Sequence, residues 1–259
     1  RWAWLAQEVG GGPDGRRFRR KWHGGEPYFR VGTPSTGILS RAPVCTAMRG
    51  RPFYPVCVQW RNRVDSFILI SGERYPMRLL VASDLHGSPE AAAFLRRRCE
   101  ELLPDMLVLL GDYLYHGPRN PLPSSYGPPS VVSVFADFDT PIVAVRGNCD
   151  AEVDLMLLPF AVEDSAVIAA DGLRIVAQHG HHLPSCPPIP GVRPGDVVLS
   201  GHTHIPRGET VDGVHFWNPG STTLPKGGFP ASYGVFEAGA FRVFGLDGRL
   251  LLEHRPSAA

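Results

Sequence analysis

Short apolar runs alternate with polar or glycine-containing segments from residue 78 onward. Runs of three to five aliphatic residues between turn-forming residues are typical of strands that are buried on both faces. The pattern therefore predicts strands at 79–82, 106–110, 141–145, 173–177 and 197–199. Further strands are predicted at 215–217, 233–237, 241–246 and 250–254.

Three helices are predicted between these strands. Ser88 and Pro89 give the signals for a helix start, an N-cap side chain followed by proline at the first position, and predict a helix from Glu90 to Leu103. Shorter helices are predicted at 131–138 and 152–158. Strand and helix alternate to about residue 160 and strands dominate afterwards, which predicts an α/β fold of two packed sheets with helices outside.

Residues 1–76 differ from the rest, being rich in Gly, Pro and Arg with little sustained periodicity. Such composition buries too little apolar surface to offset chain entropy, so we expect a poorly ordered N-terminal extension before a domain at 77–259. One hypothesis is a basic arm for nucleic acid or anionic lipid; another is translated upstream sequence before a natural initiator at Met77. We favour the second, because a strand pattern begins directly after Met77. A short strand is predicted at 67–70, without a function.

Charge follows the same division. Residues 1–77 carry 13 Lys and Arg against 5 Asp and Glu, or +8, whereas residues 78–259 carry 13 against 20, or −7. The domain's negative charge argues against a nucleic-acid module. There is no run of about 20 apolar residues and no signal-peptide pattern, so we expect no membrane span and a cytoplasmic location. The 5 cysteines are widely spaced without a CxxC pair, which favours reduced thiols.

Polar residues suited to metal binding follow the predicted strands. They are Asp84, His86, Asp112, Asn148, His179, His202 and His204. Each alone has an ordinary structural explanation, such as a turn-forming Asp or a hydrogen-bonded His. That explanation is preferred for the other histidines His181, His182, His215 and His254. Together, oxygen and imidazole ligands at strand ends favour a pair of ions such as Mn²⁺, Fe²⁺, Zn²⁺ or Ni²⁺ over Ca²⁺ or Mg²⁺ alone.

In their order these segments resemble the signature of calcineurin-like metallophosphoesterases, D-x-H, G-D, G-N-H-[DE], a later H and G-H-x-H. The resemblance covers residue 77 to about 255 and implies a sandwich of two mixed β-sheets flanked by helices. A closer likeness is to YfcE-type bacterial phosphodiesterases. It rests on residues 77–87, 116–120, 144–150, 218–221 and 225–228. That subfamily begins at the position matching Met77.

The resemblance implies a function and a ligand set. The function is hydrolysis of a small phosphodiester through a dinuclear metal centre, most simply with Mn²⁺, and a hydroxide that bridges the two ions. Asp84, His86 and His204 would bind the first ion. Asn148, His179 and His202 would bind the second, with Asp112 bridging. Arg119, Arg146 and His116 are candidate substrate-binding residues; a surface salt bridge is the alternative for either arginine.

One position departs from the general family. Cys149 replaces the histidine of G-N-H-D, the usual proton donor to the leaving group. Cys149 is thus a candidate catalytic residue beside Asn148, or a packing residue. The YfcE type also carries Cys here, so we expect phosphodiesters to be preferred to phosphomonoesters. Residues 113–129 are the expected specificity loop.

Other functions use the same fold. A phosphomonoesterase or a nucleotide pyrophosphatase would use the same ligands. A non-catalytic scaffold like a retromer subunit is disfavoured, because all seven ligand positions are filled. A homo-oligomer is compatible with the sequence.

Overall fold

The computed structural model describes residues 6–9, 17–20, 58–59, 76–183 and 189–256. The chain divides into two compact units, Arg1–Arg51 and Pro52–Ala259. In the first unit, β1 (Ala6–Val9) pairs antiparallel with β2 (Arg17–Arg20). The sequence pattern did not predict this pair of strands.

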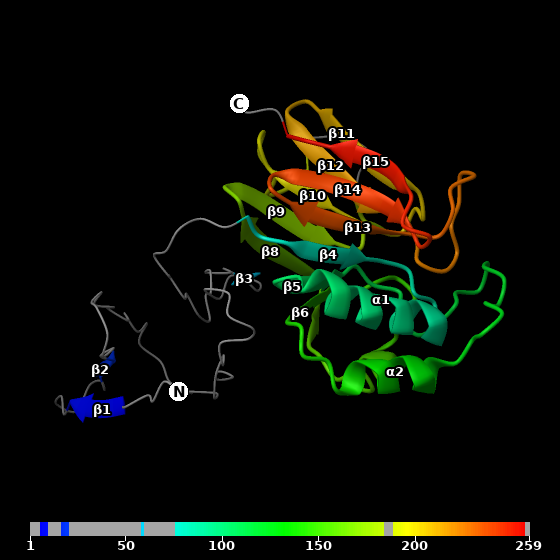
Figure 1. Cartoon of the computed structure of the whole chain (residues 1–259), viewed down its shortest axis with the longest axis horizontal. Helices are drawn as coiled ribbons and strands as arrows, with labels where there is room; N and C mark the ends of the chain where they lie inside the picture. The colour runs from blue at the N-terminus through cyan, green and yellow to red at the C-terminus, as the bar shows by residue number, and fades with distance from the viewer. Residues whose placement is uncertain (1–5, 10–16, 21–57, 60–75, 184–188, 257–259) are drawn as a thin grey trace. The chain divides into compact units, whose positions relative to one another are not determined.

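The second unit contains two mixed sheets that pack as layers (Figure 1). The seven-stranded sheet has the order β15 (Leu250–His254), β14 (Ala240–Gly245), β13 (Ser232–Glu237), β4 (Leu79–Ala82), β5 (Met106–Leu109), β6 (Ile142–Val145), β7 (Val162–Glu163). The six-stranded sheet has the order β11 (Pro206–Val211), β12 (Val214–Pro219), β10 (Val197–Leu199), β9 (Leu173–Gln178), β8 (Ser165–Ala170), β3 (Val58–Gln59). The predicted fold class is confirmed.

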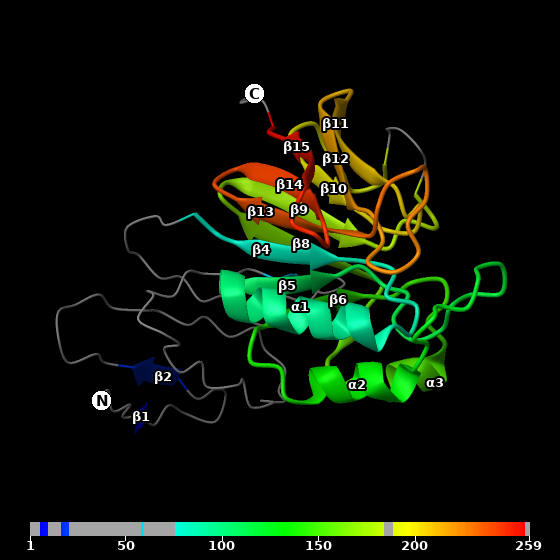
Figure 2. The same ribbon diagram turned by 45° about the vertical axis from the view of Figure 1, so that its right-hand side comes forward.

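Two helices cover the outer face of the seven-stranded sheet. They are α1 (Pro89–Leu102) and α2 (Pro128–Ala136), which lie side by side in Figures 1 and 2. The Ser88 side chain accepts a hydrogen bond from the Ala91 amide at 3.2 Å, so the predicted helix start is confirmed. The third helix, α3 (Glu152–Leu155), is a single turn. No helix in the described part of the chain is long and apolar enough to cross a membrane.

The central strands bury both faces, as their continuous apolar runs predicted. In β4, Leu79 and Val81 face the core between the sheets, whereas Leu80 and Ala82 face the helices. Trp217 of β12 lies in the core between the sheets and stacks on Phe241 of β14, with ring centroids 4.9 Å apart. Side chains of successive residues alternate between faces in a strand, so one run supplies two apolar layers.

Parallel pairing decides where the polar loops go. β4, β5 and β6 are mutually parallel in one sheet, and β9, β10 and β12 are parallel in the other. The carboxyl ends of parallel strands meet at one edge of a sheet, where open α/β sheets bind their ligands. The loops that follow β4, β5, β6, β9 and β10 carry the predicted metal ligands.

Several elements were missed from the sequence. β8 is rich in alanine, and β11 is an edge strand that begins with proline and is partly exposed, so neither shows a continuous apolar run. α2 begins three residues before the predicted start, because its two prolines suggested a loop. β3 pairs with β8 and thus places residues before Met77 in the six-stranded sheet. The strand predicted at 67–70 lies outside the described residues.

Candidate metal centre

Asp84 and His86 follow β4 in an unusual backbone conformation. Both have positive φ, 57° and 48°, and so do Asp112 at 58°, His202 at 65° and His204 at 61°. A left-handed conformation at a residue other than glycine costs about 1–3 kcal/mol, and such strain is found mostly at functional sites. Five of the seven predicted ligands share it. The surrounding packing therefore stabilises this backbone against an intrinsic penalty.

Backbone hydrogen bonds join the loop after β4 to the loop after β5. The Asp84 amide donates to the Gly111 carbonyl at 3.1 Å, and the His86 amide donates to the Asp112 carbonyl at 2.9 Å. Gly111 permits this approach: a Cβ there would lie 2.5 Å from the Gly147 nitrogen and 2.9 Å from Nδ1 of His179. Three polar loops consequently meet with almost no free space.

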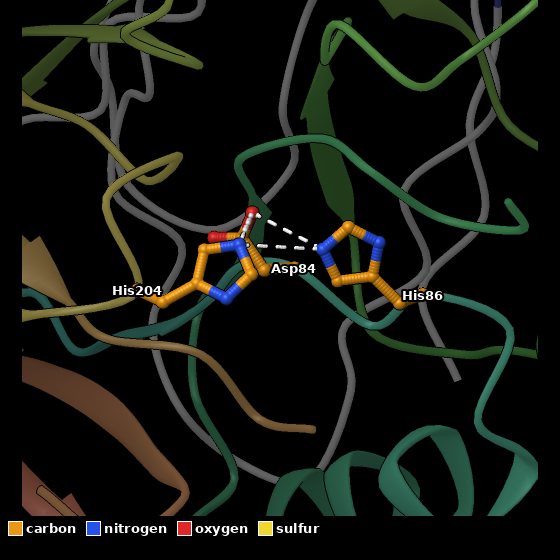
Figure 3. A group of neighbouring side chains, drawn as sticks. All are labelled: Asp84, His86 and His204. Carbon is orange, nitrogen blue, oxygen red and sulfur yellow. Dashed lines mark hydrogen bonds and ion pairs between the residues drawn. The ribbon is translucent and has the colours of Figure 1, made fainter. Parts of the chain in front are cut away.

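Asp84, His86 and His204 form a compact, buried group (Figure 3). Oδ1 of Asp84 lies 3.2 Å from Nε2 of His204 and 3.7 Å from Nε2 of His86. The two Nε2 atoms are 3.4 Å apart. Oδ1 of Asp84 is buried and accepts no hydrogen bond of normal geometry, although His204 is so close.

Three of the predicted ligand histidines are oriented by a hydrogen bond from Nδ1 to a backbone carbonyl. Nδ1 of His86 lies 2.9 Å from the Tyr115 carbonyl, and Nδ1 of His179 lies 2.6 Å from the Leu110 carbonyl. Nδ1 of His204 contacts the Leu224 carbonyl in the same way. A carbonyl only accepts, so each Nδ1 donates and the lone pair of the neutral ring is on Nε2. This arrangement is usual for metal-binding histidines.

Asp112 lies between the two predicted ligand groups. Its Oδ2 is 3.8 Å from Nε2 of His86 and 3.5 Å from Nε2 of His179. Its Oδ1 accepts a hydrogen bond from the Cys149 amide at 2.9 Å. On the far side, Nε2 of His179 is 3.0 Å from Oδ1 of Asn148. Asp112 therefore has the position expected of a bridging carboxylate.

His202, the seventh predicted ligand, lies beside His179. Their ring centroids are 5.1 Å apart, and the His202 amide donates to Oδ2 of Asp84 at 3.2 Å. Burial, together with neighbouring His179, lowers the pKa of His202. All seven predicted ligands are thus brought to one region, and their roles in metal binding stay a prediction.

Electrostatics favours an ionised Asp84. Burial acts to raise the pKa of Asp84, but the adjacent His204 outweighs it and holds this pKa below its usual value. Burial also acts on His204, yet the Asp84 carboxylate raises the pKa of that imidazole. The unpaired buried carboxylate oxygen and the converging Nε2 atoms fit divalent metal ions of the Mn²⁺ or Zn²⁺ type.

Asp150 holds the backbone of two ligand-bearing loops, a role that the sequence did not predict. Its carboxylate accepts hydrogen bonds from three backbone amides, those of Asp112 and Tyr113 at 2.8 Å and that of Gly147 at 2.7 Å. Burial raises the pKa of Asp150 to about 6, with the neighbouring Asp112 adding to the rise and the amide donors opposing it. Its place directly after Cys149 in the G-N-C-D segment was the available signal.

Asn218 and Ser221 hold the Gly-His-Thr-His loop and the Asp84 loop together. Asn218 donates to the Gly201 carbonyl at 2.7 Å, and Ser221 donates to the Asp84 carbonyl at 2.9 Å. Both side chains are buried. In the sequence, residues 218–221 stood out only through their resemblance to YfcE-type phosphodiesterases. Their hydrogen-bond partners are backbone carbonyls, and the partner of Ser221 lies more than a hundred residues away in the chain.

Cys149 is close to the centre, within 4.8 Å of ligand atoms of His86 and Asp112. The side-chain Nδ2 of Asn148 donates to its sulfur at 3.3 Å. Burial raises the pKa of the Cys149 thiol to about 12, and the Asp112 carboxylate adds to this shift. Such a thiol holds its proton strongly, so its environment lends no support to the predicted proton donor.

The predicted substrate-binding residues have different surroundings. Arg119 is exposed and makes no hydrogen bond or ion pair to any described residue. Arg146 donates to the Asp150 carbonyl at 3.1 Å and pairs with Glu152 at 2.5 Å, the salt-bridge alternative left open by the sequence. His116 lies on the predicted specificity loop between the rings of Tyr115 and Tyr126. Tyr113, the first residue of that loop, is a core residue whose hydroxyl bonds to the Val145 carbonyl.

Two of the four histidines that were assigned a structural role, His215 and His254, belong to one hydrogen-bonded network. Thr210 Oγ1 lies 2.8 Å from Nδ1 of His215 and 3.1 Å from Nε2 of His254, and Trp217 donates to Nδ1 of His254 at 2.9 Å. That prediction is confirmed for His215 and His254. His181 and His182 are exposed, and the His181 ring lies 6.1 Å from that of His202.

Comparison with known proteins agrees with this geometry. The family model of the calcineurin-like phosphoesterase superfamily domain matches residues 77–240. The chain belongs to this superfamily. The matched residues include all seven predicted ligands of this calcineurin-like domain.

Individual relatives extend the comparison. Phosphodiesterase YfcE of Escherichia coli strain K12 is 38% identical over 177 residues, which are 68% of this chain and 96% of YfcE. The solved structure of the YfcE phosphoesterase from E. coli matches with a TM-score of 0.67 and covers 70% of this chain and 100% of that one. The probable metallophosphoesterase YsnB of Bacillus subtilis strain 168 is 26% identical over 172 residues, 61% of this chain and 83% of YsnB.

Proposed function

We propose that this calcineurin-like protein is a metal-dependent phosphodiesterase that acts on small phosphodiesters with two divalent ions, foremost Mn²⁺. The carrying observation is the set of three imidazoles whose Nδ1 atoms are fixed by carbonyls and whose Nε2 atoms face two buried carboxylates. Similarity to a phosphodiesterase at 38% identity supports the choice of reaction.

The residues divide into two groups that would each hold one ion. Asp84, His86 and His204 would hold the first. Asn148, His179 and His202 would hold the second, and Asp112 would contact both. When bound, such ions neutralise charge on the phosphoryl oxygens and lower the pKa of a water molecule that attacks phosphorus in line.

The chain's own contribution is to fix these donors before a substrate arrives. Carbonyls of Tyr115, Leu110 and Leu224 orient the three rings, and Asp150 fixes the backbone of Asp112. Preorganised donors need no rearrangement during the reaction, which is a large part of electrostatic catalysis. Arg119 is the freer of the two arginines to contact a non-bridging phosphoryl oxygen, since Arg146 is paired with Glu152.

We further propose that the protein is cytoplasmic and does not bind nucleic acid, as its sequence predicted. A homo-oligomer is compatible with this function. Similarity to a phosphodiesterase supports a preference for diesters over monoesters. Cys149 in place of histidine supports a preference for good leaving groups, because their departure needs little protonation.

The test compares turnover of bis-aryl and mono-aryl phosphates with Mn²⁺ in the wild type and in Asp112→Asn. Loss of the carboxylate between the two groups should lower kcat/KM by about 10² or more and reduce bound Mn²⁺ measured by elemental analysis. Asp171→Asn, a change in the loop between β8 and β9, is the control and should retain activity. Wild-type protein that binds Mn²⁺ but hydrolyses neither ester would instead fit the scaffold hypothesis, and faster monoester cleavage would fit a phosphomonoesterase.

A further inference from the structure

The loop that follows β5 is attached to the metal centre on both sides of His116. The Tyr115 carbonyl accepts the Nδ1 hydrogen bond of His86, so the residue before His116 touches a predicted ligand. A Cβ on Gly117 would lie 3.2 Å from the sulfur of Cys149, so the residue after His116 packs on the G-N-C-D segment. The His116 backbone is therefore fixed at the rim of the centre.

Tyr126 fixes the same loop at a third point. Its ring packs against Gly87, where a Cβ would lie 2.4 Å from the ring, and the Gly127 amide donates to the Gly87 carbonyl at 2.8 Å. Gly87 directly follows His86 in the Asp84 loop. The position of Tyr126 is thereby tied to the metal-binding loop rather than to a free surface.

The ring of His116 stands edge-to-face with two tyrosine rings. Its centroid is 4.8 Å from that of Tyr115 and 5.4 Å from that of Tyr126, at interplanar angles of 67° and 81°. Neither ring nitrogen has a hydrogen-bond partner among the described residues, and Nδ1 is fully buried while the residue as a whole is partly exposed. An oriented imidazole with unused hydrogen-bonding capacity is costly as a packing residue alone.

We propose that His116 is the proton donor to the leaving-group oxygen of the phosphodiester. The inference rests on the proposed function and deepens it. Cys149, which stands where the family has its donor histidine, has its sulfur against Gly117 and next to the side-chain Nδ2 of Asn148. The residue adjoining that contact is His116, so an imidazole from the neighbouring loop takes over the task of the missing one.

The step conserves atoms and charge. The oxygen of water forms a bond to phosphorus as the bond between phosphorus and the leaving oxygen breaks. The Nε2 proton of imidazolium His116 passes to that leaving oxygen, giving the neutral alcohol or phenol. The proton released by the attacking water goes to solvent, from which His116 is protonated again.

Dependence on the leaving group tests this assignment. We would measure kcat/KM with Mn²⁺ for His116→Gln and the wild type on bis(para-nitrophenyl) phosphate, bis(para-chlorophenyl) phosphate and diphenyl phosphate. A nitrophenolate departs without a proton, so its ester should change little. Diphenyl phosphate should be slowed by about 10² or more, the usual contribution of general acid catalysis. The plot of log kcat/KM against leaving-group pKa should become steeper.

Controls separate the failure modes. His182→Gln, at an exposed histidine outside this loop, should leave the plot unchanged. Retained hydrolysis of the nitrophenyl ester by His116→Gln shows that the variant is folded and loaded with metal. An equal loss on all three esters, or no loss on any, overturns the assignment and leaves the proposed phosphodiesterase intact. Absence of hydrolysis by the wild type itself overturns the proposed function.

Discussion

At the scale of single residues, backbone carbonyls orient three of the predicted ligand histidines. The spacing of Asp84, His86 and the later histidines identified the donors. The carbonyls that fix the rings belong to Leu110, Tyr115 and Leu224, and any residue type supplies a carbonyl. No side-chain pattern marks such a partner. The pairing of Arg146 with Glu152 was likewise one of two equal alternatives until the turn between them was seen.

Cys149 gives a prediction at this scale. A thiol whose pKa is raised to about 12 is a poor proton donor, so Cys149→Ala should change kcat/KM on bis-aryl phosphates by less than about threefold. Steady-state kinetics on a series of leaving groups would check this, with bound Mn²⁺ as the control for an intact centre. A drop of about 10² that grows with leaving-group pKa would instead make Cys149 the donor.

At the scale of elements, strand runs with two apolar faces were readable and edge strands were not. β4 and β5 lie near the centre of a sheet and show continuous apolar runs. β11 lies at the edge of a sheet, pairs with one strand only and contains Pro, Gly and charged residues. The loops between elements were placed correctly because parallel strands bring their carboxyl ends together. How closely these loops approach depends on glycines such as Gly111.

Gly111 provides a matched comparison with Gly172. Both have positive φ, 97° and 83°, so alanine should cost about 1–2 kcal/mol of conformational energy at either place. Only at Gly111 would the methyl group collide with backbone, at 2.5 Å, while Gly172 has no neighbour within 4 Å. Gly111→Ala should therefore lower kcat/KM by about 10². Gly172→Ala should keep the wild-type kcat/KM but unfold at a lower urea concentration. Equal activities in the two variants would contradict the importance of close approach.

The network of His215 and His254 predicts a pH dependence of stability. Burial lowers the pKa of both imidazoles from 6.5, so the folded protein prefers them neutral. The unfolded chain then binds more protons near and below pH 6.5, and the stability from this network is present above that value and is lost as the pH falls through it. Urea unfolding of the wild type and His254→Gln should give a difference in unfolding free energy that shrinks from pH 8 to pH 5. A constant difference would refute the titration.

At the scale of the whole molecule, the division of charge and the division of function coincide. Every predicted ligand and both large sheets except β3 come from residues after Met77, the part with net charge −7. The Met77 amide donates to Asp171 at 2.9 Å, and its side chain is buried. The sequence could not predict the pairing of β3 with β8, since a two-residue strand leaves no periodicity to read.

A chain that begins at Met77 tests this division. It should keep kcat/KM on bis-aryl phosphates within about threefold of the longer chain, because all seven predicted ligands follow Met77. Its urea midpoint should lie only slightly below that of the longer chain, because the β3 pairing that is lost involves two residues. Collapse of activity at unchanged Mn²⁺ content would instead give residues 1–76 a functional role.

The position of Trp217 has a practical consequence for following all these changes. The other tryptophans, Trp2, Trp4, Trp22 and Trp60, precede Met77, so the shorter chain carries a single indole. That indole lies between the two sheets, stacks on Phe241 and donates to His254. Its fluorescence should be blue-shifted while the sheets stay packed and should shift to the red when they separate. This tryptophan thus reports on the packing between the two sheets whose strand ends carry the predicted ligands.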